Sequence, residues 1–208
     1  MTDCQITKLP ISMPLSASSS DDDRERWNRK YRESPDSWLE PDGFLAHAFD
    51  EYLRPLFPDG GSALDLAGGA GRHAIWLARQ GWEVTLMDIS ETGVEQARQK
   101  AGPFASHIHF AIDDLTHFTA SQTQFEVVMV FFYLERRIFP EIVKAIRPGG
   151  LLIYKTYTRA NLEGGPKDAA YLLAEGELLR LAQGLRVLHY REAVAEKAAA
   201  ELIAKKEC

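Results

Sequence analysis

A glycine-rich segment that follows an aspartate is the part of this sequence best suited to binding a ligand. It comprises Asp65-Leu66-Ala67-Gly68-Gly69-Ala70-Gly71, between a short apolar run and a run with helical spacing. Glycines at the first junction of a strand and a helix let a ligand approach the backbone closely. An aspartate directly before such a turn opposes a pyrophosphate but suits a ligand with an ammonium group. The segment therefore predicts a cofactor site, and Asp65 predicts a positive charge on the cofactor.

Asp88 supplies a second acid to this predicted site, because it ends the next apolar run after the glycine turn. A carboxylate at the tip of a second strand can accept two hydrogen bonds from a ribose diol. The spacing Gly69-x-Gly71-x-x-Ala74 also fits the dinucleotide fingerprint, so a ribose alone does not separate the two cofactor classes. An ammonium group together with a ribose favours S-adenosylmethionine. A nicotinamide-dependent oxidoreductase is the alternative.

The elements around these acids alternate between strand and helix patterns. Strand-like runs cover residues 63–66, 83–87, 107–112, 125–131, 151–157, 185–190 and 199–205. Helical patterns between them cover residues 72–80, 91–100, 138–146 and 177–182. The last two strands lack an intervening helix, so we expect an antiparallel hairpin that turns at Glu196 and Lys197. The predicted fold class is α/β: a doubly wound, seven-stranded, mostly parallel sheet with an antiparallel C-terminal hairpin.

The N-terminal part is predicted to be a tail followed by a helical cap. Residues 1–23 include the polar run SASSSDDD and are expected to be a disordered tail. Residues 24–60 hold two helical patterns, one with Trp27 and Tyr31 on the same face and one from Phe44 to Phe57. Residues 24–208 are thus predicted to form one domain, with 24–60 as the cap and 61–208 as the core. The cap helix is either a lid over the cofactor, with Trp27 and Tyr31, or an ordinary packed helix.

Composition and charge exclude several classes of protein. The chain has 208 residues, is 45% hydrophobic and carries a net charge of -6. Such an acidic chain repels nucleic acids and anionic membranes, and acids interleave its one run of basic residues. Cys4 and Cys208 lie at opposite ends, and no histidine spacing suits a metal, so no metal site is expected. No apolar run approaches the ~20 residues of a membrane span, and no signal peptide is recognised, so a cytoplasmic location is expected.

The glycine turn resembles the nucleotide-binding motif of class I S-adenosylmethionine-dependent methyltransferases. That motif is an acid followed by Gly-x-Gly-x-Gly, and here Ala67 replaces the first glycine. Residues 112–115 are similar to the family's adenine-contacting segment, and residues 125–130 and 147–153 to its fourth and fifth strands. Three further segments, 27–31, 132–136 and 176–190, resemble the tellurite-resistance methyltransferase branch. The resemblance covers roughly residues 24–205 and implies a Rossmann-like methyltransferase fold with S-adenosylmethionine as cofactor.

The residues and the resemblance together define a predicted site. Asp114 is expected to contact the adenine in preference to Asp113. Phe132 and Tyr133 are the predicted catalytic residues, because an aromatic wall aligns the methyl group and its faces stabilise a sulfonium. The predicted cofactor-binding residues are Trp27, Tyr31, Asp65, Ala67, Gly68, Gly69, Gly71, Asp88, Ile89, Asp113, Asp114, Leu115 and Phe131.

The methyl acceptor is predicted to be a small molecule. A soft nucleophile such as a thiolate or an oxyanion needs no general base, whereas a hydroxyl or amine would need one from His47, Glu135 or Tyr157. No Asp/Asn-Pro-Pro-Tyr segment follows the fourth strand, which argues against amino methylation of nucleic-acid bases. Phe132 and Lys155 depart from the residues that the family commonly has there. A non-catalytic nucleoside-binding module is therefore a further alternative.

Overall fold

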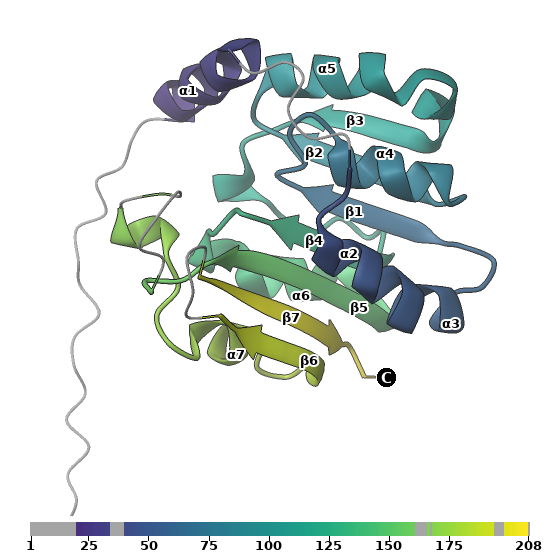
Figure 1. Cartoon of the computed structure of the whole chain (residues 1–208), viewed down its shortest axis with the longest axis vertical. Coiled ribbons are helices and arrows are strands. Elements are labelled where there is room, and N and C mark those ends of the chain that lie inside the picture. The colour runs from purple at the N-terminus through teal and green to yellow at the C-terminus, as the bar shows by residue number, and fades with distance from the viewer. Residues whose placement is uncertain (1–19, 34–39, 161–165, 167, 194–197, 208) are drawn as a thin grey trace, which may run out of the picture.

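A seven-stranded sheet with helices on both faces forms the centre of the molecule (Figure 1). The computed structural model describes residues 20–33, 40–160, 166, 168–193 and 198–207. The strand order is β3-β2-β1-β4-β5-β7-β6, in which β7 runs antiparallel to both β5 and β6. The strands are β1 Ser62–Leu66, β2 Glu83–Asp88, β3 Ile108–Ile112, β4 Phe125–Phe131, β5 Ile146–Tyr157, β6 Arg186–Glu192 and β7 Ala199–Lys205. The predicted seven-stranded fold with its C-terminal hairpin is confirmed, while the expected turn at 196–197 lies outside the described residues.

The helices lie close to where the periodicity predicts them. Described helices are α1 Ser20–Glu33, α2 Gly43–Ala48, α3 Arg54–Leu56, α4 Arg72–Arg79, α5 Glu91–Ala101, α6 Phe139–Ala145 and α7 Glu177–Leu181. The single helix expected over 44–57 is instead divided by a π-helical turn at Phe49–Leu53. Pro55 causes this division, because it has no N–H for the helical ladder and the Arg54 N–H bonds to Phe49 O instead.

Two element boundaries differ from the prediction for identifiable reasons. β5 begins at Ile146, five residues before the expected start at Leu151. The Gly149 N–H donates to Lys206 O and the Lys206 N–H donates to Gly150 O, so pairing with the distant C-terminal segment extends the strand. Helix α1 begins at Ser20, within the predicted tail, and three aspartates in its first turn favour the positive end of the helix dipole. Residues 1–19 of that tail lie outside the described part.

Alternate residues of the central strand β4 face two separate cores. Val127, Met129 and Phe131 pack with α2, α4 and α5 on one face of the sheet. Val128 and Val130 pack with α6 and α7 on the other face. Burial on both faces explains why this strand is almost entirely apolar.

The carboxyl ends of the parallel strands meet at one edge of the sheet, and α1 lies across part of that edge. Figure 1 shows α1 beside α5. α1 also contacts the C-terminal half of the chain, because the Arg26 guanidinium lies 5.8 Å from the ring centre of Tyr171 in the short turn Ala169–Tyr171. Ligands of open α/β sheets bind at this edge, so α1 stands where a cap would stand. No helix in the described part of the chain is long and apolar enough to cross a membrane.

Candidate functional site

The glycine turn joins β1 to α4 through three residues with a positive φ. Ala67 has φ +59°, Gly69 has φ +53° and Gly71 has φ +81°. The Ala67 N–H donates to Met87 O at 2.9 Å, which holds the start of the turn against β2. A left-handed alanine costs roughly 1–2 kcal/mol relative to glycine. Ala67 therefore accommodates the shape of the glycine motif at a modest cost in stability.

The absence of a side chain at the three glycines of the turn leaves room for neighbouring atoms. A Cβ on Gly68 would lie 2.8 Å from Asp65 Oδ2, and a Cβ on Gly71 would lie 2.7 Å from the Cβ of Ala97. A Cβ on Gly69 would collide with the hydroxyl of Tyr31. The turn is therefore a cradle of bare backbone that side chains at these positions would fill.

Asp65 is buried at the end of β1 with no partner for its carboxylate. Its side chain is 1% exposed, and neither oxygen accepts a hydrogen bond of normal geometry from the described residues. Burial raises the pKa of Asp65 to about 7, the Ala74 amide lowers it in part, Asp88 raises it and Arg72 lowers it. A buried carboxylate without a partner is costly unless a ligand supplies one. Asp65 therefore fits the predicted ammonium group.

Asp88 organises the glycine turn as well as facing the site. Its Oδ2 accepts from the Gly69 N–H at 2.9 Å, and its Oδ1 accepts from the Ser90 N–H at 2.8 Å. Burial raises the pKa of Asp88 to about 6, although these amides lower it. Each carboxylate oxygen keeps a second lone pair, so a ribose diol can still bind. The sequence predicted only that Asp88 binds the ribose. The structure shows in addition that Asp88 stabilises the glycine turn through the Gly69 N–H.

Asn28 fastens α1 to the start of α5, a role that the sequence analysis did not predict. Asn28 is buried, and its Oδ1 accepts from Ser90 Oγ at 2.7 Å and from the Thr92 N–H at 3.1 Å. Gln96 Nε2 also donates to the backbone oxygen of Tyr31 at 2.9 Å. The only local signal was a polar residue beside Trp27, three positions before Tyr31 on the same helical face.

The two aromatic residues of α1 differ in their distance from the glycine turn. Tyr31 contacts Gly69 and Gly93 directly. Burial raises the pKa of the Tyr31 hydroxyl, and the nearby carboxylates of Asp88 and Asp65 raise it further. Trp27 lies one helical turn away with its ring centre 6.2 Å from that of Tyr31, and Lys30 Nζ lies 4.3 Å from the Trp27 ring. The structure thus brings Tyr31, but not Trp27, onto the predicted cofactor site.

The predicted adenine segment follows β3. Asp114 Oδ1 accepts from the Thr116 N–H at 2.9 Å, and this and other hydrogen bonds hold the pKa of Asp114 below its usual range despite partial burial. Asp113 is exposed, and the side chain of Leu115 belongs to the core.

Two isoleucines lie at the carboxyl ends of β2 and β3, close to the two predicted acids. Ile112 is 50% exposed at the end of β3 and lies opposite Asp88 in the ladder, while Ile89 follows directly after β2. A large apolar side chain exposed at a ligand edge suits a stacked base, so Ile112 joins the candidate site. Its signal in the sequence was an isoleucine at the tip of a strand, where a polar residue would be ordinary.

Phe131, Phe132 and Tyr133 end β4 and face different sides of the sheet. The Phe131 ring centre lies 4.1 Å from that of His73, and the ring belongs to the core of the α4 face. Phe132 has φ +57°, a conformation that a bulky residue adopts only under strain, and such strain is concentrated at functional sites. Tyr133 packs on the opposite face, and its backbone oxygen accepts from the Tyr154 hydroxyl at 2.8 Å.

Positive charge lies close to the ring of Phe132. Lys155 Nζ and the Arg72 guanidinium carbon are each 5.8 Å from the Phe132 ring centre. Lys155 also forms ion pairs with Asp42 at 2.8 Å and Glu201 at 3.0 Å, which ties the cap residue of α2 to β5. Of the two cations near this ring, Lys155 is held in place by its ion pairs.

The structure separates the three candidates for a general base. Glu135 is occupied by an ion pair with Arg137 at 2.9 Å. The Tyr157 and Phe132 ring centres lie 4.9 Å apart with the rings tilted by 38°, whereas the ring centre of His47 lies 5.7 Å from that of His189. Among these, only Tyr157 contacts a predicted catalytic residue.

His73 is a buried imidazole that the sequence analysis left without a role at the site. It is 3% exposed, and no described residue bonds its Nε2. Burial lowers the pKa of His73 to about 3, so the ring is neutral at physiological pH.

Comparisons with known proteins identify the type of domain that contains the glycine turn. Residues 63–150 match the family model described as a methyltransferase domain. The matched segment contains the glycine turn, both acids of the site and the whole of β4. Residues 63–150 form a methyltransferase domain. S-adenosylmethionine is the cofactor of such domains, and the bare cradle and the unpartnered Asp65 carboxylate fit it.

Curated relatives match this chain over only part of their own length. The putative methyltransferase YqeM of Bacillus subtilis is 28% identical over 130 residues, which is 56% of this chain and 52% of the relative. The tRNA 5-carboxymethoxyuridine methyltransferase of Escherichia coli is 30% identical over 125 residues, 54% of this chain and 46% of the relative. The chain thus spans about half the length of the curated relatives it matches.

Solved structures share the fold of this methyltransferase domain. TehB from Haemophilus influenzae superposes with a TM-score of 0.68 at 17% identity, covering 87% of this chain and 67% of that one. The N-methyltransferase NodS from Bradyrhizobium japonicum, in complex with S-adenosyl-l-homocysteine, gives a TM-score of 0.66 at 19% identity and covers 88% of this chain and 97% of that one. At these identities the likeness shows the fold, which is the Rossmann-like methyltransferase fold that the sequence predicted.

Proposed function

We propose that this protein transfers the methyl group of S-adenosylmethionine to a small molecule, through a soft nucleophile such as a thiolate or an oxyanion. The single observation that carries the cofactor half of this proposal is Asp65, a buried carboxylate without a partner beside a cradle of bare backbone. A nicotinamide dinucleotide would place a pyrophosphate against that carboxylate, so Asp65 argues against the oxidoreductase alternative.

In this proposal the strand tips hold successive parts of the cofactor. Asp65 binds the ammonium group, and the backbone of the turn from Ala67 to Gly71 lies against the methionine part and the ribose. Asp88 accepts hydrogen bonds from the ribose hydroxyls, and the Asp113–Leu115 segment contacts the adenine edge. Ile89 and Ile112 cover the adenine face.

The N-terminal helix closes this site in the proposal. Tyr31 already contacts the glycine turn, and Asn28 fixes the helix to α5 through polar bonds that can open without exposing a large apolar surface. Trp27 covers the outer side of Tyr31. Residues 24–60 thus form the cap and residues 61–208 the core of one domain. A lid of this kind excludes water from the reacting groups.

S-adenosylmethionine supplies an activated methyl group on a sulfonium when it is bound. The chain must then align the nucleophile with that methyl, which is worth ~7–11 kcal/mol of barrier lowering. Phe132 limits the space at the end of β4 and offers an aromatic face to a positively charged sulfonium, whereas Phe131 and Tyr133 pack against the cores on the two faces of the sheet and hold this strand end in place. The strained backbone of Phe132 supports its assignment to this wall.

The charges around Phe132 support an anionic nucleophile. Lys155 and Arg72 each lie 5.8 Å from the centre of a ring that the acceptor must pass, and a cation stabilises a thiolate relative to its thiol. No general base is then needed.

A nucleic-acid acceptor is not favoured by the charges of α1. Three of its five basic residues, Arg24, Arg26 and Arg32, form ion pairs with acids of the same helix, which offsets much of its positive charge. Bound phosphates would have to displace these acids.

The test of this proposal combines binding and turnover. Calorimetry should show binding of S-adenosylhomocysteine and none of NAD or NADP. Labelled S-adenosylmethionine should then transfer its methyl to members of a panel of thiols and oxyanions, with amines, hydroxyl compounds and total tRNA as further arms. Binding of NAD alone would refute the cofactor, and transfer to tRNA alone would refute the small acceptor. Binding without any transfer would favour the non-catalytic module.

A further inference from the structure

The side chain of Tyr31 lies in a slot between two glycines. A Cβ on Gly69 would overlap the Tyr31 hydroxyl oxygen and lie 2.7 Å from its Cζ, and a Cβ on Gly93 would lie 2.9 Å from both Cδ2 and Cε2 of the ring. Gly93 belongs to the first turn of α5, where an alanine would favour the helix more than a glycine does. The absence of a side chain at both positions therefore makes the slot that the tyrosine occupies.

The hydroxyl end of Tyr31 lies where the proposed cofactor must pass. In the proposed function, Asp65 binds the ammonium group and Asp88 binds the ribose, so the part of the cofactor between these groups crosses the glycine turn. Burial raises the pKa of the Tyr31 hydroxyl, the carboxylates of Asp88 and Asp65 raise it further, and the Ala70 amide lowers it in part, which agrees with an oxygen close to all three groups. The tyrosine also covers Gly69 itself. Because two groups cannot fill the same space, a seated Tyr31 and a bound cofactor exclude each other.

Polar groups hold α1 in this position. Asn28 Oδ1 accepts from Ser90 Oγ at 2.7 Å and from the Thr92 N–H at 3.1 Å, and Gln96 Nε2 donates to the backbone oxygen of Tyr31 at 2.9 Å. Among the described residues, the two apolar cores of the sheet include none from α1. Polar groups that separate can bond to water instead, so each such bond contributes only modestly to the closed position.

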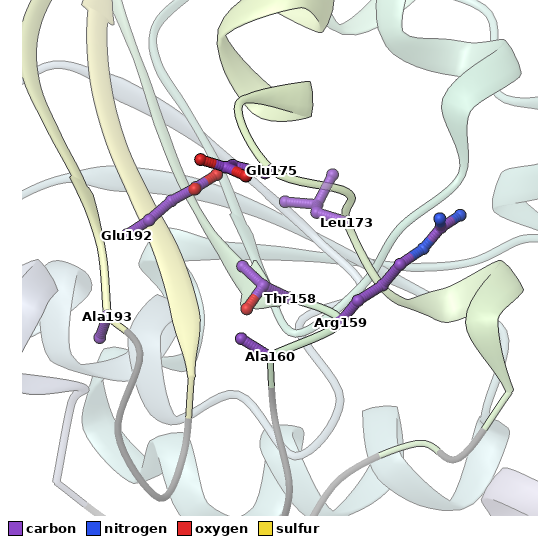
Figure 2. Close-up of a pocket in the computed structure, with 7 residues that line it drawn as sticks. All are labelled: Thr158, Arg159, Ala160, Leu173, Glu175, Glu192 and Ala193. Atoms are coloured by element: carbon purple, nitrogen blue, oxygen red, sulfur yellow. The ribbon is translucent and has the colours of Figure 1, made fainter.

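The other side of α1 makes a contact that is equally easy to break. The exposed Arg26 guanidinium lies 5.8 Å from the ring centre of Tyr171. From Tyr171 the chain continues to Leu173 and Glu175, which line a cavity of about 360 Å³ beyond the ends of β5 and β6 (Figure 2). A contact between an exposed cation and an aromatic ring is weak in water. α1 can therefore leave the glycine turn without opening either core.

We propose that α1 holds the ligand-free protein in an autoinhibited state, in which Tyr31, seated between Gly69 and Gly93, excludes S-adenosylmethionine from the glycine turn. The cofactor enters only after the tyrosine has left its slot, so the open fraction limits the apparent affinity and the opening rate limits association. The inference rests on the proposed function, and it adds an order of events: α1 opens, the cofactor enters, and α1 closes over it.

Stopped-flow fluorescence of the whole protein with S-adenosylhomocysteine tests this order. Trp27 lies beside Tyr31 on α1, and a Trp27→Phe variant identifies its share of the signal. The observed rate should level off at high ligand concentration, because opening becomes limiting. Gly93→Ala places a Cβ against the tyrosine ring but keeps α1 as a cover for the bound cofactor, so it should raise the limiting rate about tenfold or more. Gly43→Ala is the matched control, because nothing lies within 4 Å of a Cβ there, and it should leave the rate unchanged.

Nitration by tetranitromethane, located by peptide mass spectrometry, reads the slot without any cofactor. Tyr31 should be protected in the ligand-free wild type and should react about fivefold faster or more in Gly93→Ala, with Tyr52 in the π-helical turn as the internal reference. Asn28→Ala removes the acceptor that fastens α1 and should raise both the nitration of Tyr31 and the limiting rate. Arg29→Ala, which alters an exposed residue of the same helix, should change neither.

The results separate this proposal from the proposed function. S-adenosylhomocysteine that binds neither the wild type nor Gly93→Ala refutes the methyltransferase function. If it binds, an observed rate that stays linear in ligand concentration refutes autoinhibition alone, as do equal limiting rates in the wild type, Gly93→Ala and Asn28→Ala. Tyr31 that reacts equally fast in the wild type and in both variants also overturns it. Weaker binding by Gly93→Ala with unchanged association would show that the slot serves the bound state, and it would overturn the proposal as well.

Discussion

The unpartnered carboxylate of Asp65 predicts that cofactor binding depends on pH near neutrality. In the free protein burial raises the pKa of Asp65 to about 7, so a proton occupies it in much of the population at neutral pH. An ammonium group binds the ionised form, and binding therefore expels that proton. Between pH 6 and pH 7 the ionised fraction of Asp65 rises about fivefold. The ionised fraction of Asp88, whose pKa is raised to about 6, rises about twofold over the same range. If both carboxylates must be ionised, the affinity for the cofactor should rise about tenfold.

Calorimetry with S-adenosylhomocysteine measures this dependence directly. The dissociation constant should fall about tenfold from pH 6 to pH 7, and titrations in two buffers of different ionisation enthalpy should show release of between one and two protons at pH 6, roughly 0.9 from Asp65 and roughly 0.5 from Asp88. Asp65→Asn should bind the ligand much more weakly and retain only the twofold part due to Asp88. An affinity that is independent of pH in this range, or an Asp65→Asn variant with full affinity, would refute the assignment of Asp65 to the ammonium group.

The stability of the ligand-free protein provides a check of opposite sign. A buried acid with a raised pKa binds its proton more tightly in the folded state, so its contribution to stability is present at low pH and is lost as pH rises through about 7. For Asp65 the loss is at most about 4 kcal/mol between acid and alkaline pH. At pH 8 ligand-free Asp65→Asn should therefore be more stable than the wild type in urea, although it binds the cofactor less well. Equal stabilities at pH 8 would contradict the buried, unpartnered state of this carboxylate.

The geometry of the glycine turn and of α1 leads to four further predictions. Asp88→Ala should weaken S-adenosylhomocysteine binding and also lower stability in urea by about 1–3 kcal/mol, because two buried N–H groups lose their acceptor; unchanged stability would contradict those bonds. Ala67→Gly relieves a left-handed alanine and should raise the melting temperature by about 1–4 °C with full binding, and a fall would show that the strain is absent. Gly69→Val should displace Tyr31 and abolish S-adenosylhomocysteine binding in calorimetry while circular dichroism still shows the sheet; full affinity would place the ligand elsewhere. Removal of residues 1–33 should leave a near-native melting temperature but remove the stabilisation by S-adenosylhomocysteine, whereas a collapsed melting temperature would identify α1 as part of the core.

Local patterns in the sequence determined the sheet, the glycine turn and the type of cofactor. Strand and helix periods depend on residues only a few positions apart, and the mostly parallel sheet with its C-terminal hairpin follows from the alternation that these periods reveal. The left-handed conformations at Ala67 and Gly71 are likewise local properties of a short turn. For this reason the seven strands and the position of the turn agree with the prediction.

Only the tertiary structure decided which polar groups have partners. The bond from Ser90 to Asn28 spans 62 positions, and the extension of β5 depends on Lys206, so no local pattern could show either. The unpartnered state of Asp65 depends on every element that packs around it, since a carboxylate becomes costly only when the whole fold removes water without supplying a donor. Burial and hydrogen bonding are collective properties of the packed chain, and they decide where this protein still requires a ligand.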